Sequence, residues 1–112
     1  MNTKTLDTNT ASSGTLFTLM QSWHDSVAVY EQLAFASSGD TILLTQDAVL
    51  ALQSQITLAS FLAKCESLGV IVAALAEDCQ LRGIKPYSSL VKMIDYAGFV
   101  DLVCKHDRQV SW

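Results

Sequence analysis

The stretch that most constrains the fold is a run of six apolar residues at positions 70–75, Val-Ile-Val-Ala-Ala-Leu. It shows no alternation of apolar and polar positions, which is typical of a strand covered on both faces in a parallel sheet flanked by helices. Two acids and a thiol, Glu77, Asp78 and Cys79, follow where such a strand passes into a helix. In open α/β sheets ligands bind at the carboxyl ends of the strands. This edge is therefore where a functional site is first expected.

Further strands and helices are predicted on both sides of this run. Residues 15–20, 41–45 and 91–94 have the pattern of strands, and a tail at 108–112 is expected to add an edge strand. Helices are predicted near 25–37, at 46–68 with an interruption near Gln53, at 78–82 ending at Gly83, and from Asp95 to His106. The expected buried faces are Ile56, Ala59, Leu62, Ala63 and Glu66 in the long helix, and Tyr96, Phe99, Val100 and Val103 in the last one.

The alternation of strands and helices predicts an α/β fold. Right-handed βαβ units would build a three-layer α/β/α sandwich around a mainly parallel sheet of four or five strands. Residues 15–112 are expected to form this single domain. Residues 1–14 are mainly Thr, Ser, Asn and Asp with little to bury, and are expected to be a flexible leader.

Composition limits the partners of the chain. Its net charge is -4 and it has only seven Lys and Arg residues, so neither direct nucleic-acid binding nor binding to a membrane surface is expected. Half of the residues are hydrophobic and only 16% are charged, too few to cover a domain of 112 residues. We therefore expect an obligate oligomer. With no membrane span, no signal peptide and three cysteines that do not suggest a disulfide framework, the expected location is the cytoplasm.

The candidate functional residues lie at the predicted carboxyl edge. Cys79 is the one thiol there, although the two preceding acids should raise its pKa; Cys65 and Cys104 are expected to fill the core. Ser22, His24, Asp47 and Asp78 would line a ligand or partner edge. His106 is expected at the end of the last helix, where the helix dipole favours a cation. No metal site and no nucleotide cofactor is expected, because ligand spacing and glycine-rich phosphate loops are absent from the sequence.

Several phrases, in order and spacing, carry a resemblance to a known family over about 95 residues. They are residues 16–19 with Ser22, residues 39–47 (Gly-Asp-Thr-Ile-Leu-Leu-Thr-Gln-Asp), residues 74–78 leading to Arg82-Gly83, residues 94–96, Phe99-Val100, Leu102, Lys105-His106 and the final Ser111-Trp112. Together they resemble the TusB/DsrH family of sulfur-relay subunits.

The resemblance implies a flavodoxin-like (DsrEFH-like) domain and a function. Family members assemble with TusC-like and TusD-like sister chains into a dimer of heterotrimers, which passes persulfide sulfur toward 2-thiolation of the wobble uridine in tRNA. A related trio serves dissimilatory sulfur oxidation. The sulfur-carrying cysteine belongs to the TusD-like chain. Here Leu75 falls nearer to that register than Cys79, and Gln32 stands where some DsrH-type members carry another cysteine.

Together these observations predict a non-catalytic, cytoplasmic TusB-like subunit that needs no cofactor. Its candidate interface residues are Tyr96, Phe99, His106 and Trp112, and a homo-oligomer is an alternative when the chain is alone. Three other functions stay open: a DsrH-like subunit in sulfur oxidation, a sulfurtransferase using Cys79, and a small-molecule sensor at the carboxyl edge.

Overall fold

The chain folds around a five-stranded parallel sheet. The structure is a computed structural model and describes residues 14–20, 33–53, 55–85 and 90–111. The strands are β2 (Thr15–Leu19), β3 (Thr41–Leu44), β4 (Ile71–Leu75), β5 (Val91–Ile94) and β6 (Arg108–Ser111). Their order in the sheet is β5-β4-β3-β2-β6, and every neighbouring pair is parallel. The predicted α/β fold class is confirmed, and the tail does add an edge strand.

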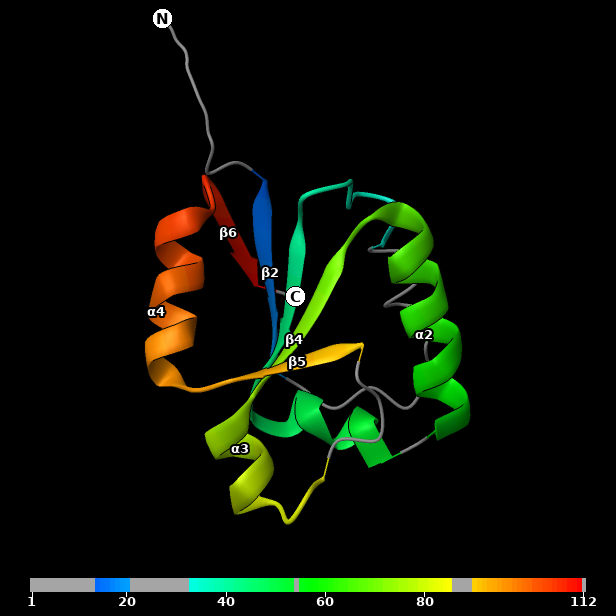
Figure 1. Cartoon of the computed structure of the whole chain (residues 1–112), viewed down its shortest axis with the longest axis vertical. Helices are drawn as coiled ribbons and strands as arrows, with labels where there is room; N and C mark the ends of the chain where they lie inside the picture. Colours follow the sequence, from blue (N-terminus) through cyan, green and yellow to red (C-terminus); the bar gives the residue numbers. More distant parts are fainter. Residues whose placement is uncertain (1–13, 21–32, 54, 86–89, 112) are drawn as a thin grey trace, which may run out of the picture.

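Helices cover both faces of this sheet, so the molecule has three layers (Figure 1). On one face lie η1, a 3-10 helix (Gln46–Gln53), and α2 (Gln55–Leu68). On the opposite face lies α4 (Tyr96–Lys105), which returns the chain from β5 to β6 at the other edge. The short helix α3 (Ala76–Leu81) follows β4 directly. The helical region predicted at 46–68 is therefore divided near Gln53 as expected, and its first part, η1, is a 3-10 helix rather than an α-helix.

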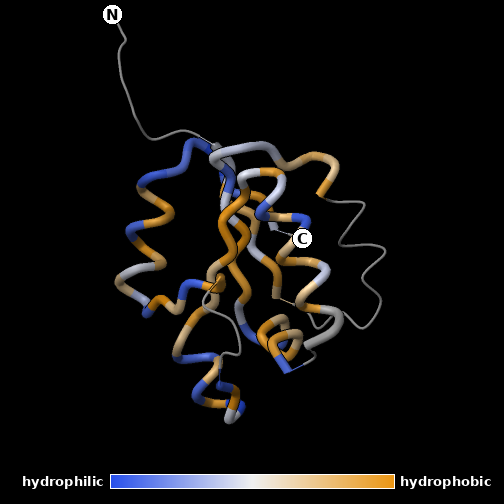
Figure 2. The backbone as a smooth tube through the Cα atoms, turned by 45° about the vertical axis from the view of Figure 1, so that its right-hand side comes forward, coloured by the Kyte–Doolittle hydropathy of each residue, from blue (hydrophilic) through white to orange (hydrophobic). Residues whose placement is uncertain are grey.

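The strands place successive side chains on opposite faces, which divides the core in two. The larger cluster joins Phe17, Ile42 and Val72 of the strands to Leu58 and Phe61 of α2. The smaller one joins Leu16, Leu43 and Ala73 to Ile94, Phe99 and Leu102 on the α4 side. Figure 2 shows the apolar strands in the middle of the molecule, between the helices. The run at 70–75 is buried as predicted, except at Ile71, which is 46% exposed.

Two predicted helix faces were only partly correct: Leu62 is buried and Phe99 packs on the sheet as expected, the side chain of Ile56 lies outside the described ones, and the other predicted residues are exposed. In α2 the buried side chains are Leu58, Phe61, Leu62 and Cys65, while Ala59, Ala63 and Glu66 are exposed. The larger side chains bury more apolar area and so set the rotation of the helix. In α4 the residues packed on the sheet are Phe99 and Leu102, whereas Tyr96, Val100 and Val103 are 54%, 60% and 39% exposed. Cys104 is exposed as well, so it does not fill the core; Cys65 does.

His106 ties α4 to the amino edge of the sheet. It is the C-cap of α4, and its Nδ1 donates to the Leu102 carbonyl at 2.7 Å while Nε2 lies 3.0 Å from the Thr41 hydroxyl. Since the carbonyl only accepts, Nδ1 carries a proton, and a neutral ring accepts from Thr41 through Nε2. Its position at the helix end is as predicted.

No single helix in the described ranges is long and apolar enough to cross a membrane. One pair, Gln46–Gln53 with Leu58–Leu68, meets the criterion of length and composition only when taken together, and it is bent by 107°.

Candidate functional site

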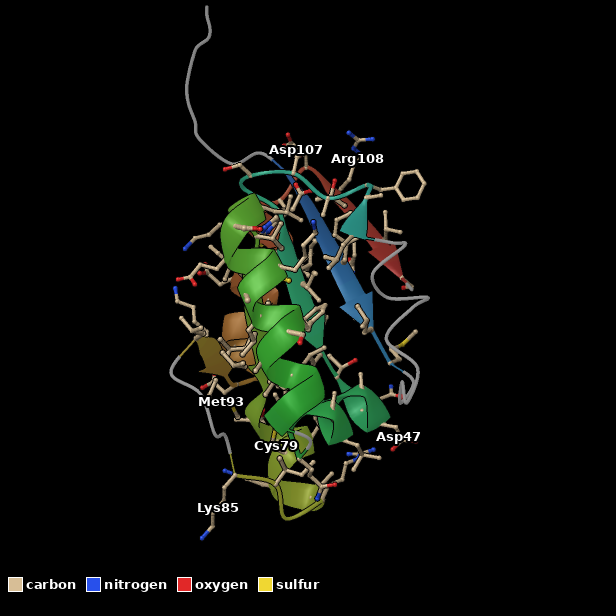
Figure 3. The ribbon with its side chains drawn as sticks, turned by 90° about the vertical axis from the view of Figure 1, so that its right-hand side faces the viewer. Asp47, Cys79, Lys85, Met93, Asp107 and Arg108 are labelled. Carbon is tan, nitrogen blue, oxygen red and sulfur yellow. The ribbon has the colours of Figure 1, made fainter. Side chains whose placement is uncertain are left out.

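The carboxyl ends of β2, β3 and β4 meet at one edge of the sheet, as the sequence predicts. Helices η1, α3 and α4 all begin there, directly after β3, β4 and β5 respectively. Figure 3 places Asp47 and Cys79 at this end, and Asp107 and Arg108 at the other. The candidate site is therefore built from the strand ends and the first turns of three helices.

Arg82 holds two carboxylates together at this edge. Its Nε and Nη2 both donate to Asp47 Oδ1, at 3.1 and 2.9 Å. Its Nη1 donates to the Asp78 carbonyl at 3.2 Å and lies 3.8 Å from Asp78 Oδ1. The guanidinium thus connects η1 to α3. Arg82 belongs to the Arg-Gly phrase of the sequence, but nothing in its local pattern predicted this role, because its partner lies 35 residues away.

Asp78 is the buried member of this group. Its side chain accepts a hydrogen bond of 2.7 Å from the backbone N–H of Gln46, and the residue is only 7% exposed. Gln46 has a φ of +49°, a left-handed conformation that is uncommon for residues other than glycine. Asp78 therefore fixes the turn by which β3 passes into η1.

Cys79 is buried at 1% exposure and lies in the larger core cluster. Burial raises the pKa of its thiol, and the Asp78 carboxylate raises it further, while Arg82 lowers it. A nucleophilic thiol needs access and a lowered pKa. The predicted effect of the acid on this pKa is confirmed, and the surroundings are those of a core cysteine.

A cavity of about 300 Å³ opens beside these residues, on the α4 face of the sheet. Phe99, Leu75 and Met20 give it apolar walls, and the polar lining residues are Thr18, Thr45, Gln46, Asp78, Tyr96, Gln109 and Ser111. Asp78 is the one residue among them with a charged side chain. The cavity is at the lower end of the range for small-ligand sites.

Thr18 is the unusual member of this lining. It is 6% exposed, and its hydroxyl has no hydrogen-bond partner within the ranges that the structure describes. The nearby Thr45 hydroxyl, by contrast, donates to the Leu19 carbonyl at 2.9 Å. A buried hydroxyl without a partner costs free energy, and such a group in a native fold needs an explanation.

The first turn of α4 borders the same cavity and is held by two acids, its own N-cap Asp95 and Glu77 of α3. Asp95 is the predicted N-cap, and its side chain accepts from the Gly98 N–H at 2.9 Å. Glu77 of α3 accepts from the Tyr96 N–H through Oε2 at 3.2 Å, while its Oε1 is buried without a partner among the described residues. Four carboxylates, those of Asp47, Glu77, Asp78 and Asp95, thus lie at this edge together with the guanidinium of Arg82, so the edge has an excess of negative charge.

The structure brings together only some of the predicted site residues. Asp47 and Asp78 share Arg82, and Tyr96 and Phe99 line the cavity. His106 lies at the opposite edge of the sheet. Ser22, His24, Trp112, residues 25–32 of the predicted helix near 25–37 and residues 1–13 of the expected leader fall outside the described residues. In the described part of that predicted helix, Leu33 is helical and residues 34–35 form a turn, so the helix ends earlier than expected. Thr18 was missed because a hydroxyl on a strand has no sequence signature.

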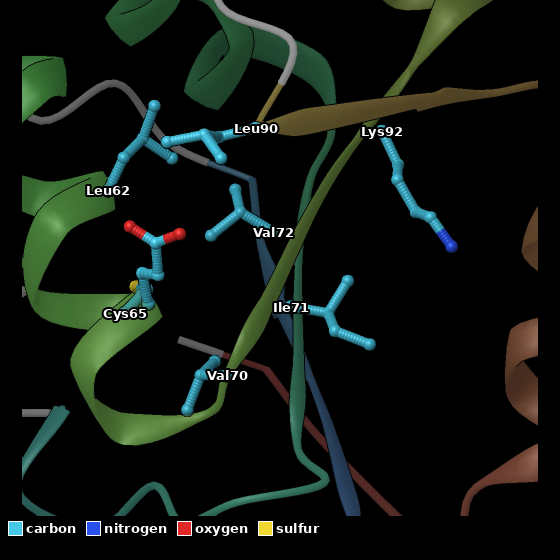
Figure 4. Close-up of a pocket in the computed structure, with 8 residues that line it drawn as sticks. Leu62, Cys65, Val70, Ile71, Val72, Leu90 and Lys92 are labelled. Atoms are coloured by element: carbon cyan, nitrogen blue, oxygen red, sulfur yellow. The ribbon is translucent and has the colours of Figure 1, made fainter.

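A second cavity, of about 260 Å³, lies near the start of β5 (Figure 4). Leu62 and Cys65 of α2 line it together with Val70, Val72 and Leu90, and Ile71 and Lys92 lie on the other side of β4. Burial raises the pKa of the Cys65 thiol to about 12. The walls are mainly apolar and extend the core. Among the described residues, no group of three or more His, Cys, Asp or Glu side chains could hold a metal ion.

Comparisons with known proteins give consistent matches. A sequence model of the family described as DsrH like protein matches residues 21–109. Protein TusB of Photorhabdus laumondii is 41% identical over 75 residues, covering 66% of this chain and 76% of that protein. Protein TusB of Buchnera aphidicola is 37% identical over 98 residues, covering 87% and 99%, and that of Escherichia coli K12 is 36% identical over 81 residues, covering 71% and 82%.

A solved structure shares the fold. The ychN protein of Escherichia coli superposes with a TM-score of 0.65 over 89% of this chain and 99% of that chain. The two sequences are 14% identical, so this likeness concerns the architecture alone.

Proposed function

The chain belongs to the DsrH-like protein family, and from this we propose that it is a non-catalytic subunit of a TusBCD-like sulfur-relay complex that supports 2-thiolation of the wobble uridine in tRNA. The resemblance inferred from the sequence is thus confirmed at the level of the family. The tRNA pathway is favoured over dissimilatory sulfur oxidation because relatives named Protein TusB match this chain over 99% of their own length.

The observation that carries the non-catalytic role is the burial of Cys79. A relay cysteine accepts sulfur from one protein and gives it to another, so its sulfur atom must be reachable and partly ionised. Cys79 is 1% exposed and its pKa is raised. Cys65 is equally buried, and Cys104 is exposed on α4, away from the carboxyl edge.

Assembly with sister chains is supported by the outer side of α4. Tyr96, Val100 and Val103 recur at helical spacing and leave a stripe of exposed apolar side chains, while Phe99 and Leu102 pack inward. A helix that is apolar on both sides is normally covered on both sides. We propose that TusC-like and TusD-like chains cover this stripe in a cytoplasmic dimer of heterotrimers.

The first experiment is co-expression with TusC-like and TusD-like chains followed by native mass spectrometry. The expected result is one stable complex that contains all three chains. A well-behaved monomer that ignores both sisters would contradict the proposal. Deleting residues 108–112 is not a clean test of the interface, because β6 pairs with β2 and its removal also exposes the sheet.

The second experiment tests the non-catalytic role. In a host lacking this chain, Cys79→Ala is expected to restore 2-thiouridine in tRNA as well as the wild type does, with the modified nucleoside measured by mass spectrometry. The melting temperature of the purified variant controls for folding, since alanine leaves a small cavity. A folded, assembled Cys79→Ala complex without thiolation would instead support the sulfurtransferase function.

A further inference from the structure

We propose that the cavity at the carboxyl edge is a binding site for a guanidinium group, with the Thr18 hydroxyl and the Asp78 carboxylate as its acceptors. Both residues line the cavity and are only 6% and 7% exposed, and the Thr18 hydroxyl has no partner in the described ranges. The inference does not depend on the sulfur-relay role, which needs no ligand in this chain.

The charge of the cavity determines the sign of the ligand. Among the described residues that line it, Asp78 is the one with a charged side chain, and none is Lys or Arg. Glu77, Asp95 and Asp47 lie around it at the same edge, and Arg82 already serves both Asp47 and Asp78. An anion such as phosphate would meet the Asp78 carboxylate, and the nearby Arg82 guanidinium is already shared between two carboxylates. A cationic donor is the complementary ligand.

The hydrogen-bonding groups favour the same answer. Asp78 Oδ2 is used by the Gln46 N–H, while Oδ1 lies 3.8 Å from the nearest Arg82 nitrogen, too far for a hydrogen bond. Thr18 offers lone pairs, and the Thr45 hydroxyl, whose proton goes to the Leu19 carbonyl, offers lone pairs as well. The cavity therefore presents several acceptors to a ligand with several N–H groups.

The walls distinguish a guanidinium from a simple ammonium. Two aromatic residues, Phe99 and Tyr96, are among the lining residues, together with Leu75. A planar, weakly hydrated guanidinium stacks on such rings and also donates in its own plane. The volume of about 300 Å³ exceeds what the head group alone needs, so it also admits the aliphatic part of an arginine.

The test is an amide-shift titration by NMR on the full chain, with methylguanidinium as the probe and N-methylurea as its neutral isostere. Saturable shifts at Thr18, Thr45 and Ser111 are expected for the cation in the low-millimolar range, and none for the urea. Thr18→Val, which keeps the shape and removes the hydroxyl, is expected to weaken binding about tenfold. Asp78→Asn is expected to weaken it at least as much, whereas Asp47→Asn, outside the lining, changes it less than about threefold.

Two further measurements test the role of Thr18 in stability and the source of the guanidinium group. The melting temperature of free Thr18→Val is expected to stay level or rise, because the hydroxyl it removes has no partner to lose; a lower melting temperature together with unchanged binding would assign Thr18 a structural role only. Tighter binding of N-acetyl-arginine N-methylamide than of L-arginine indicates the side chain of a partner protein, and the reverse order indicates a free metabolite. The proposal is overturned if methylguanidinium gives no saturable shift, or if the urea binds as well.

Discussion

At the scale of single residues, Asp78 has the largest structural role at the carboxyl edge. It is buried, it accepts from the N–H of a residue with a left-handed backbone, and it shares Arg82 with Asp47. Asp47 makes shorter contacts to the same guanidinium, yet 63% of its side chain is exposed. The two carboxylates therefore share the partner Arg82 but differ strongly in burial, and burial decides how much each contributes to the free energy of unfolding.

Asp78→Ala is expected to lower the free energy of unfolding by about 2–3 kcal/mol, because it leaves a buried N–H without an acceptor. Asp47→Ala, the matched control, removes an exposed ion pair and is expected to cost less than about 1 kcal/mol. Urea unfolding followed by circular dichroism measures both. Equal losses in the two variants would show that the Gln46 contact does not matter.

The buried thiol of Cys65 is expected to make the fold less stable as the pH rises into the alkaline range. Burial raises the pKa of Cys65 from 9.0 to about 12, so the unfolded chain ionises first. The stabilising effect is complete below pH 9 and is lost as pH rises from 9 toward 12, at about 1.4 kcal/mol per pH unit. Cys65→Ala is expected to remove this slope relative to wild type in urea unfolding at pH 8 to 10.5. A wild-type profile parallel to that of the variant would refute the assignment.

Access to the thiols separates the three cysteines in a second measurement. Brief alkylation with iodoacetamide at pH 8, read by peptide mass spectrometry, is expected to modify Cys104 first. Cys65 and Cys79 should react at least about tenfold more slowly, because they are buried and their thiolate fractions are small. Labelling of Cys79 as fast as Cys104 would reopen its candidacy as a sulfur carrier.

The sequence predicted some of these residues better than others. Burial is the largest cause of the raised pKa of Cys79 and was not predicted; of the two acids expected to raise this pKa, Asp78 does so. Asp78 also lies at the carboxyl edge, as expected. Thr18, Arg82 and the role of Gln46 were not predicted, because each depends on contacts between segments distant in the chain. Cys104 was wrongly assigned to the core from helical spacing, which shows an apolar stripe but not which side of it meets the sheet.

At the scale of elements, α4 is the helix whose boundaries were best predicted and whose packing was not. Asp95 caps it and His106 ends it as expected. Its sequence is apolar on two sides, and periodicity alone does not show which side faces the sheet. The side with Phe99 and Leu102 faces the sheet because Leu16, Leu43 and Ala73 lie beneath it. The same ambiguity affected α2, where larger side chains outweighed the alanines.

Asp95→Ala is expected to lower the free energy of unfolding by about 1 kcal/mol, since it removes the acceptor for the Gly98 N–H. The control is Asp101→Ala in the same helix, which removes only the exposed 2.9 Å ion pair with Lys105. It is expected to cost about 0.3–0.5 kcal/mol. If urea unfolding gave the same loss for both, the cap would contribute nothing beyond surface charge.

At the scale of the whole molecule, the sequence predicted the class of fold but not the order of its strands. Alternating strands and helices imply parallel pairing, and the strand count of four or five was correct. The position of β6 beside β2 depends on α4 crossing back over the opposite face, which no local pattern encodes. Among the described elements, α4 is the one helix on this face, and its outer stripe is exposed.

Charge placed in this stripe should separate assembly from folding. Val100→Asp is expected to weaken binding to the sister chains at least about tenfold, because a carboxylate buried without a partner in an apolar interface is strongly unfavourable. The melting temperature of the isolated chain should hardly change, since Val100 is 60% exposed. Glu66→Lys, an exposed charge change on α2, is the control and should assemble normally. Native mass spectrometry reads the assembly; full assembly of Val100→Asp would move the interface away from α4, and failure of both variants would mean that charge anywhere disturbs the complex.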